Sequence, residues 1–299
     1  MNPVLLRLYP AGFRRAFGDE IAESYREATE GAGRRARLRE AADIAAHAVR
    51  LRLGLGSAHP GGRLAAVTAP FALAATATYA AFNLIVSAAD WYAMHTAGTA
   101  DDFGTFPTLT NGCHLLTLIG AVVALAGRHL PGLLCAVAGA VGGSATFLFW
   151  VWPLPPGTRW DLAGFLLTPV LVAALPLACP PDLRPARRVR GLAGMLALTA
   201  WAVLLVAAVA VINPPGVGRF PWLFGVPMAA ALSLAGRRAF AAIRTTPQLA
   251  CSAAPFVLTM HFTGWVDSEE ILALLGALAV AAPALRLWRG GGSGTVTPT

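Results

Sequence analysis

The chain has 299 residues, of which 56% are hydrophobic and only 13% charged, and its formal net charge at pH 7 is +8. Soluble globular proteins carry about 25% charged residues, so this composition excludes an ordinary soluble domain and favours a membrane protein. The four cysteines are scattered without a CxxC pair, which argues against a disulfide framework and against a thiolate metal site.

Residues 1–60 are predicted to form a cytosolic prefix of amphipathic helices. The first helix has apolar residues at every fourth position, namely Phe13, Phe17, Ile21 and Tyr25. The residues GAG at 31–33 end it, and an Arg-rich second helix follows. Its apolar stripe consists of Leu38, Ala41, Ile44, Ala48, Leu51 and Leu55. We expect the two stripes to pack together as a helical hairpin, which is so small that it rests on the membrane domain, the bilayer or a partner.

Residues 61–289 are divided by charged residues into apolar intervals, and a helix that crosses a bilayer needs about 20 such residues. Eight spans are predicted, near residues 64–89, 109–127, 132–152, 162–180, 191–212, 220–236, 247–265 and 270–285. The last interval is short, so seven spans with a re-entrant or interfacial final segment is the alternative. The predicted fold class is all-α, a polytopic transmembrane helix bundle with a small N-terminal hairpin and a disordered tail at 290–299.

The arginines indicate how the bundle is oriented in the membrane. All 23 basic residues are arginine, and with eight spans only Arg159 and Arg219 lie in the loops of one side. That side also holds seven of the acidic residues. The positive-inside rule therefore predicts that both termini lie on the cytoplasmic side of the membrane, taken to be a bacterial plasma membrane. The net positive charge follows from this topology, so the lipid bilayer is the expected partner and nucleic acid is not.

The loops of the Arg-poor side suggest two further features. The first of these loops is predicted at residues 90–112, long enough to cover the outer mouth of the bundle. Two shorter turns resemble each other, PPGTRWDLAGF at 155–165 and PPGVGRFPWLFG at 214–225. They indicate either an internal repeat of helix pairs, as in many transporters, or a common choice of residues for interfacial turns.

The predicted spans contain few residues that could carry chemistry. They hold no acidic or basic residue at mid-membrane, which argues against an ion-coupled carrier. The polar residues expected to make hydrogen bonds between helices are Thr76, Thr78, Asn83, His114, Thr117, Thr259 and His261. His95, His114 and His261 could instead meet around a metal, but no HxxxH or HExxH spacing supports this, and neither a metal nor a cofactor is expected. Gly139 and Gly143 have the GxxxG spacing that lets a helix approach a neighbour closely.

No nucleophile, phosphate-binding or metalloprotease motif occurs in a convincing context, so we expect a protein that is not an enzyme. Asp90, Asp101 and Asp102 are the only candidates for an embedded enzyme that acts on lipid-linked substrates.

The opening segment, residues 5–55, resembles the N-terminal prefix of bacterial permease-like membrane proteins and of uncharacterised, mostly actinobacterial multi-pass proteins. The shared pattern is LYPxxFRxxYGxEM followed by an Arg-rich helix. The residues that match it are Leu8, Tyr9, Pro10, Phe13, Arg14, Gly18 and Glu20. Phe17 stands where Tyr is usual, and Ile21 where Met is usual. The resemblance implies a membrane part of a regulatory or export system, often encoded beside a PadR-type repressor. Permeases with this prefix combine a large extracytoplasmic domain with four long spans, which is not the arrangement predicted here, so only the prefix is implied.

We therefore expect a non-enzymatic membrane sensor or interaction protein whose prefix docks a cytosolic or membrane protein. The candidate docking surface comprises Tyr9, Pro10, Phe13, Arg14, Phe17 and Ile21. The alternatives are the membrane subunit of a transporter or permease, favoured by eight spans and the possible repeat, and the embedded enzyme.

Overall fold

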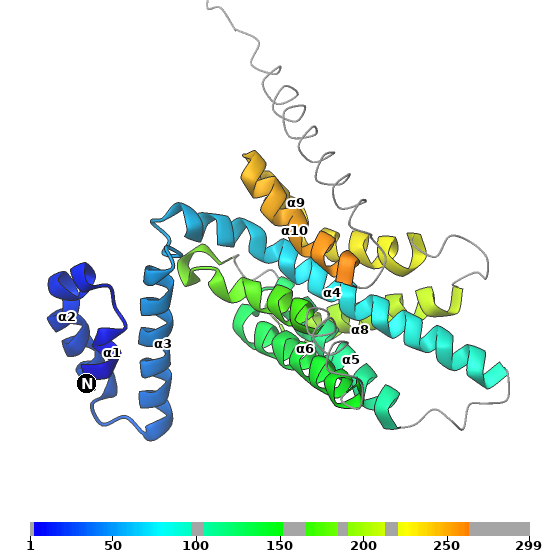
Figure 1. The fold of residues 1–299 in the computed structure, drawn as a ribbon, viewed down its shortest axis with the longest axis horizontal. Helices are drawn as coiled ribbons and strands as arrows, with labels where there is room; N and C mark the ends of the chain where they lie inside the picture. Colours follow the sequence, from blue (N-terminus) through cyan, green and yellow to red (C-terminus); the bar gives the residue numbers. More distant parts are fainter. Residues whose placement is uncertain (1–2, 97–104, 152–165, 185–190, 213–220, 263–299) are drawn as a thin grey trace, which may run out of the picture. The chain divides into compact units, whose positions relative to one another are not determined.

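The computed structural model describes residues 3–96, 105–151, 166–184, 191–212 and 221–262. Every regular element within these ranges is a helix, as the all-α prediction requires (Figure 1). The chain divides into two compact units. The first unit contains Met1–Ala66 and Ala178–Arg184, and the second contains Val67–Leu177 and Pro185–Thr299.

The first unit contains the predicted helical hairpin. A short helix, α1 (Pro3–Arg7), precedes the two main helices, α2 (Ala11–Thr29) and α3 (Arg34–Arg52). The chain reverses between them at Gly31, whose φ of 68° lies in the left-handed region that glycine adopts without steric cost. The two helices share one hydrophobic core, so the predicted packing of their apolar stripes is confirmed.

The hairpin does not bury both stripes completely. Phe17 on α2 is 46% exposed, and Leu38 on α3 is 62% exposed. Leu38 lies six residues before Ile44, which places it about 120° around the helix from that core residue. The prediction that Leu38 belongs to the buried stripe is therefore wrong, and an apolar side chain is left on the outer surface of α3.

The second unit contains most of the long apolar helices. Its described helices are α4 (Pro60–Thr96, which begins in the first unit), α5 (Thr105–Leu125), α6 (His129–Val151), the helix Leu166–Ala178, α8 (Leu192–Ile212), α9 (Val226–Ala242) and α10 (Thr246–Phe262). Among the described residues, α4, α5, α6 and α8 are long and apolar enough to cross a membrane. Seven of the eight predicted spans coincide with a described helix, at least in part, while residues 270–285 and the tail lie outside the described residues.

Helix α4 corrects one prediction. It has 37 residues and is therefore about 55 Å long, well beyond the roughly 30 Å thickness of a bilayer core. It continues to Thr96, and α5 already begins at Thr105. The long external loop predicted at residues 90–112 is therefore wrong, because its two ends are helical. Charged and polar residues such as Asp90 and Asn111 mark where a helix leaves apolar surroundings, but they do not end it.

The last two described helices are shorter, with 17 residues each. A π-helical turn, η4 (Pro221–Gly225), leads directly into α9. Within α9, Gly236 has φ 77° and ψ 164°, a conformation suited to glycine that interrupts the regular helix. This break lies at the predicted end of the sixth span, directly before Arg237 and Arg238.

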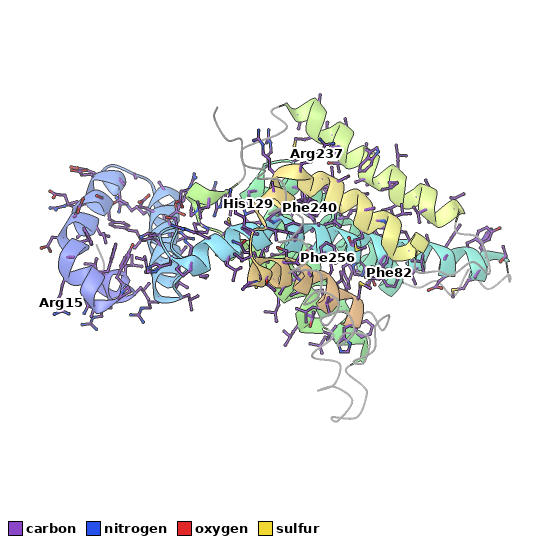
Figure 2. All side chains as sticks on the ribbon, turned by 90° about the horizontal axis from the view of Figure 1, so that it is seen from above. Arg15, Phe82, His129, Arg237, Phe240 and Phe256 are labelled. Atoms are coloured by element: carbon purple, nitrogen blue, oxygen red, sulfur yellow. The ribbon has the colours of Figure 1, made fainter. Side chains whose placement is uncertain are left out.

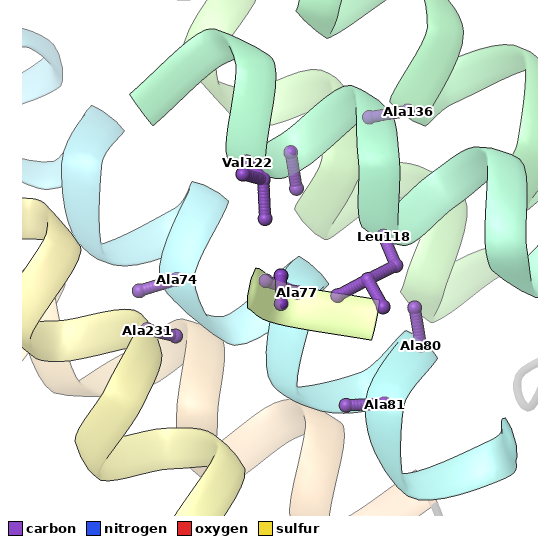
Figure 3. Packing of buried hydrophobic residues seen from close by; sticks show 10 residues of the cluster. Ala74, Ala77, Ala80, Ala81, Leu118, Val122, Ala136 and Ala231 are labelled. Atoms are coloured by element: carbon purple, nitrogen blue, oxygen red, sulfur yellow. The ribbon is translucent and has the colours of Figure 1, made fainter. Parts of the chain in front are cut away.

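Small residues form the core of the second unit. Figure 3 shows alanines of α4 meeting α5, α6, α8 and α9. The ten buried members are Ala74, Ala77, Ala80, Ala81, Leu118, Ala121, Val122, Ala136, Ala202 and Ala231. Because lipid tails are as apolar as leucine, helices associate in a membrane mainly by close packing, which small residues allow. In the most apolar window of each helix, 67% of α4 but only 17% of α8 is buried, so α4 is the central helix.

Helices α5 and α6 make the closest helix–helix contact in this core, and they lie side by side in Figure 1. A Cβ atom added to Gly120 of α5 would lie 2.6 Å from the carbonyl oxygen of Gly132 of α6. A Cβ atom added to Gly139 would likewise lie 2.6 Å from the carbonyl oxygen of Cys113. The predicted close approach at Gly139 is thus confirmed, and the neighbour is α5 of the same chain.

The polar residues of these helices bond mainly within their own helix. Asn83 donates to the carbonyl oxygen of Tyr79 at 2.8 Å. The threonine hydroxyls that bond the carbonyl four residues earlier are those of Thr76, Thr78, Thr117 and Thr259. For Thr76, Thr78, Asn83 and Thr117, local bonds thus take the place of the predicted interhelical ones. Other residues link helices, since Asn111 donates to the Ser87 hydroxyl and Ser144 to the Leu166 carbonyl, both at 2.7 Å.

Candidate docking surface on the prefix

The prefix is built around a small core of its own. Tyr9, Ile44 and Ala48 are buried there, with 3%, 8% and 0% of their surface exposed. The partly buried residues that pack around them are Leu5, Leu8, Phe13, Ile21, Tyr25 and Leu51. The core draws on α1, α2, α3 and the turn between α1 and α2, so the relative position of these segments is fixed by shared packing.

The six residues of the candidate docking surface differ in how accessible they are. Tyr9 is buried, and Pro10, Phe13 and Ile21 are partly buried. Arg14 and Phe17 are exposed. Most of the predicted surface is therefore used within the hairpin, and Arg14 and Phe17 are the members that a partner can reach.

A series of aromatic rings connects the core to this exposed pair. Tyr9 stacks on Phe13 with 5.4 Å between ring centroids, and Phe13 contacts Phe17 at 4.9 Å. Such ring pairs stabilise beyond the area that they bury, and they hold Phe17 in a defined position. Pro10 precedes the first turn of α2, and its carbonyl oxygen accepts a hydrogen bond of 2.9 Å from the Arg14 N–H.

Arg14 lies on the same side of α2 as Phe17, three residues before it. Its aliphatic stem crosses Gly18, where an added Cβ atom would lie 3.5 Å from the Arg14 Cγ atom. Arg14 thus covers the glycine with its stem while its guanidinium group stays in solvent. Arg15, by contrast, projects from α2 and donates to the carbonyl oxygen of Ala11 at 3.4 Å (Figure 2).

His47 on α3 also contacts the aromatic rings of Tyr9 and Phe13, although it was not among the residues predicted from the sequence. Its ring lies 5.8 Å from that of Tyr9 and 6.2 Å from that of Phe13. Burial lowers the pKa of His47, and the positive charge of Arg50 lowers it further. Burial also raises the pKa of Tyr9, an effect that Arg50 opposes. The position of His47, three residues after Ile44 and next to Ala48, was the available sequence signal.

The other predicted candidates are not brought together. His114 is buried against Tyr79, with 5.7 Å between the ring centroids, and His95 stacks on Trp91 at 5.2 Å. In the part of the chain that the structure describes, no group of three or more His, Cys, Asp or Glu residues could hold a metal ion. Asp90 is exposed near the C-terminal end of α4, whereas Asp101 and Asp102 lie outside the described residues, as do most of the two similar turns at 155–165 and 214–225.

A small cavity lies among α4, α5, α8 and α9. It has a volume of about 30 Å³, and apolar side chains line it, including Ala77, Trp201 and Leu234. Such a volume holds about one water molecule, and a site without polar partners stays dry. The exposed Arg14–Phe17 pair on the prefix is therefore the stronger candidate for recognition.

No protein-family model matches the chain, and no curated protein or solved structure matches it either.

Proposed function

We propose that this chain is a polytopic protein of the bacterial plasma membrane that acts as a membrane sensor or interaction protein, without enzymatic activity of its own. In this proposal eight helices span the membrane, both termini are cytoplasmic, and the prefix docks a protein partner. The apolar helices α4, α5, α6 and α8 and the concentration of arginines on one set of loops support the membrane placement.

The main support for the docking role is that one large aromatic side chain, Phe17, lies outside the hairpin core. The hairpin core already contains Tyr9, Phe13 and Ile21, yet Phe17 is 46% exposed beside the exposed Arg14. Aromatic and arginine side chains are the residues that most often dominate binding energy at protein interfaces. The partner that fits this pair is a protein with an apolar pocket for the Phe17 ring and an acidic group for Arg14. The resemblance to the permease-associated prefix implies a membrane part of a regulatory or export system, in which a docking role for this segment is expected.

Crosslinking and co-purification of the full-length protein from its native membrane would test the proposal. Phe17→Ala is expected to weaken capture of the partner about tenfold or more, because it removes the side chain that enters the pocket. Arg15→Ala is the matched control, since Arg15 is exposed on the same helix but lies about 160° around it from Phe17. Arg14→Glu should weaken capture as well, by reversing the charge that faces the partner.

Two results would contradict the docking role. The first is an unchanged set of captured proteins when residues 1–56 are deleted. The second is an equal loss of capture with Phe17→Ala and Arg15→Ala, which would point to general destabilisation of the prefix. An ATPase that is captured equally with and without the prefix would favour the transporter subunit instead.

A further inference from the structure

The outer face of α3 carries large apolar side chains that the hairpin core does not use. Leu38 is 62% exposed, Val49 48% and Leu53, at the helix end, 65%. Single apolar side chains are common on protein surfaces, but helical geometry places these three within about 60° of one another. The exposed Ala42 lies between them, so the face presents a continuous apolar stripe.

Arginines border this stripe on both sides. Helix α3 contains six arginines and only two acidic residues. Helical positions place Arg34 along one edge of the stripe and Arg39 along the other, and Arg35 lies one turn before Leu38; all three are exposed. Arg52, at the end of α3, instead donates a hydrogen bond of 2.8 Å to the Arg7 carbonyl oxygen of α1. Among the described residues the one ion pair joins Arg26 and Glu23 on α2, so no described carboxylate forms an ion pair with the arginines of α3.

We propose that this outer face of α3, namely Leu38, Ala42, Val49 and Leu53 with Arg34, Arg35 and Arg39, binds the anionic lipid surface of the cytoplasmic leaflet. The inference rests on the proposed cytoplasmic location of the prefix, but it uses a different helix face from the Arg14–Phe17 pair. A helix with an apolar centre and flanking arginines lies in the plane of a membrane surface, where its apolar side chains enter the headgroup region and its cations meet lipid phosphates. Each arginine near an anionic leaflet strengthens such binding about fivefold.

The charges of the two prefix helices favour a lipid surface as the occupant of this face. Helix α2 carries three arginines and four acidic residues, so the excess of positive charge lies on α3. The chain also keeps α3 near the bilayer, because only residues 53–59 separate it from α4, whose apolar part is a candidate span. Seven residues reach at most about 25 Å, so the end of α3 cannot move far from the point at which α4 enters the membrane.

A fluorophore on the outer face of α3 would test this proposal in the full-length protein. The four native cysteines are replaced by serine, and Ala42→Cys is labelled with an environment-sensitive dye. The protein is reconstituted into nanodiscs of phosphatidylcholine alone or of phosphatidylcholine mixed with phosphatidylglycerol. Ala16→Cys, an exposed alanine on α2, is the matched control label.

The Ala42→Cys label is expected to shift to shorter wavelength only in nanodiscs that contain phosphatidylglycerol, and high salt should reverse the shift. Arg35→Gln combined with Arg39→Gln should lower the ratio of surface-bound to free prefix about 30-fold, since two arginines are lost. Arg15→Gln combined with Arg26→Gln, on α2, should leave that ratio unchanged. The Ala16→Cys label should report no shift in either lipid, which shows that the shift is specific to the outer face of α3.

A shift that is equal in both lipids, or that persists in the Arg35 and Arg39 variant, would overturn the proposal. A shift that grows with protein concentration in detergent would assign the face to a second copy of the chain. A shift that requires added cytosolic protein would assign it to a protein partner. None of these results depends on capture through Phe17, so the two proposals fail separately.

Discussion

Gly120 illustrates how much of the second unit depends on the absence of a side chain. An added Cβ atom at this position would lie 2.6 Å from the carbonyl oxygen of Gly132 and 2.8 Å from the Cα atom of Ala136. Both neighbours are backbone atoms of α6, so they cannot move aside as a flexible side chain could. The two helices would have to move apart along their whole contact, and dispersion contacts between them would be lost. Between helices in a membrane such close packing is a main source of stability, because lipid offers no hydrophobic driving force.

Gly120→Ala is therefore expected to lower the free energy of unfolding by about 1 to 3 kcal/mol, the usual cost of overpacking. Thermal unfolding of the purified full-length protein in detergent would measure it. Gly112→Ala on the same helix is the matched control, because nothing lies within 4 Å of the added atom. The control should be neutral or stabilising by up to about 1 kcal/mol, since alanine favours helix more than glycine does. If the two variants unfold alike, the close contact between α5 and α6 does not contribute to stability.

The sequence identified some residues of the candidate site but not how they divide between core and surface. The four-residue spacing of Phe13, Phe17, Ile21 and Tyr25 shows that they share a helix side, yet a spacing of four drifts by about 40° at each step. Phe17 lies between Phe13 and Ile21 on that side, so the spacing gives no sign that its ring is the exposed one, which depends on how α1 and α3 pack against α2. His47 was missed because a histidine on a helix has no distinctive spacing, and its role arises from Tyr9 and Phe13, which lie far away in the sequence.

At the scale of elements, the core of the prefix makes its stability depend on pH. Packing against Tyr9 and Phe13 lowers the pKa of His47, and Arg50 adds to this effect. In the unfolded chain a histidine has its ordinary pKa of about 6.5. Protons therefore bind more readily to the unfolded prefix as the pH falls below that value. The stability that neutral His47 contributes is fully present above about pH 6.5 and is lost as the pH falls through the lower pKa of the folded state.

Hydrogen exchange of the full-length protein would measure this dependence. The amides of α3 around Ile44 and Ala48 should lose protection when the pH is lowered from about 7.5 to about 5.5, after correction for the intrinsic exchange rates. His47→Gln should remove most of the difference between the two conditions. His59→Gln should preserve it, because His59 lies in the linker and His47 is the histidine that contacts the Tyr9 and Phe13 rings. Equal protection of the unmodified chain at both pH values would mean that His47 is not coupled to folding of the prefix.

Helix positions could be predicted well from the sequence, whereas helix ends could not. The spans predicted at 109–127, 132–152 and 191–212 lie within a few residues of α5, α6 and α8. These intervals were defined by charged residues, which cannot easily enter hydrocarbon. Charge marks the edge of the apolar region, however, and a helix continues past that edge as long as its backbone bonds are satisfied. For this reason α4 extends to Thr96, through residues that the sequence assigned to a loop.

At the scale of the whole molecule, one long helix and one charge asymmetry determine the proposed arrangement. Alanines along α4 share one buried cluster with residues of α5, α6, α8 and α9. In the proposed arrangement, the arginines outside the apolar intervals orient the bundle. The asymmetry could be predicted from the sequence, because it depends only on the positions of the charged residues and on the number of spans between them. The pairing of helices could not be predicted, since alanine and glycine occur on several faces of most spans and only the fold selects which ones meet.

The proposed topology is tested most directly by reporter fusions along the chain. Fusions after residues 100 and 159 should report the extracytoplasmic side, and fusions after residues 187 and 240 should report the cytoplasm. A fusion at the C-terminus should also report the cytoplasm if there are eight spans, and the opposite side if the segment near 270–285 does not cross. A reversal at any of the four internal positions would contradict the span count, the orientation of the arginines and the cytoplasmic location of the prefix.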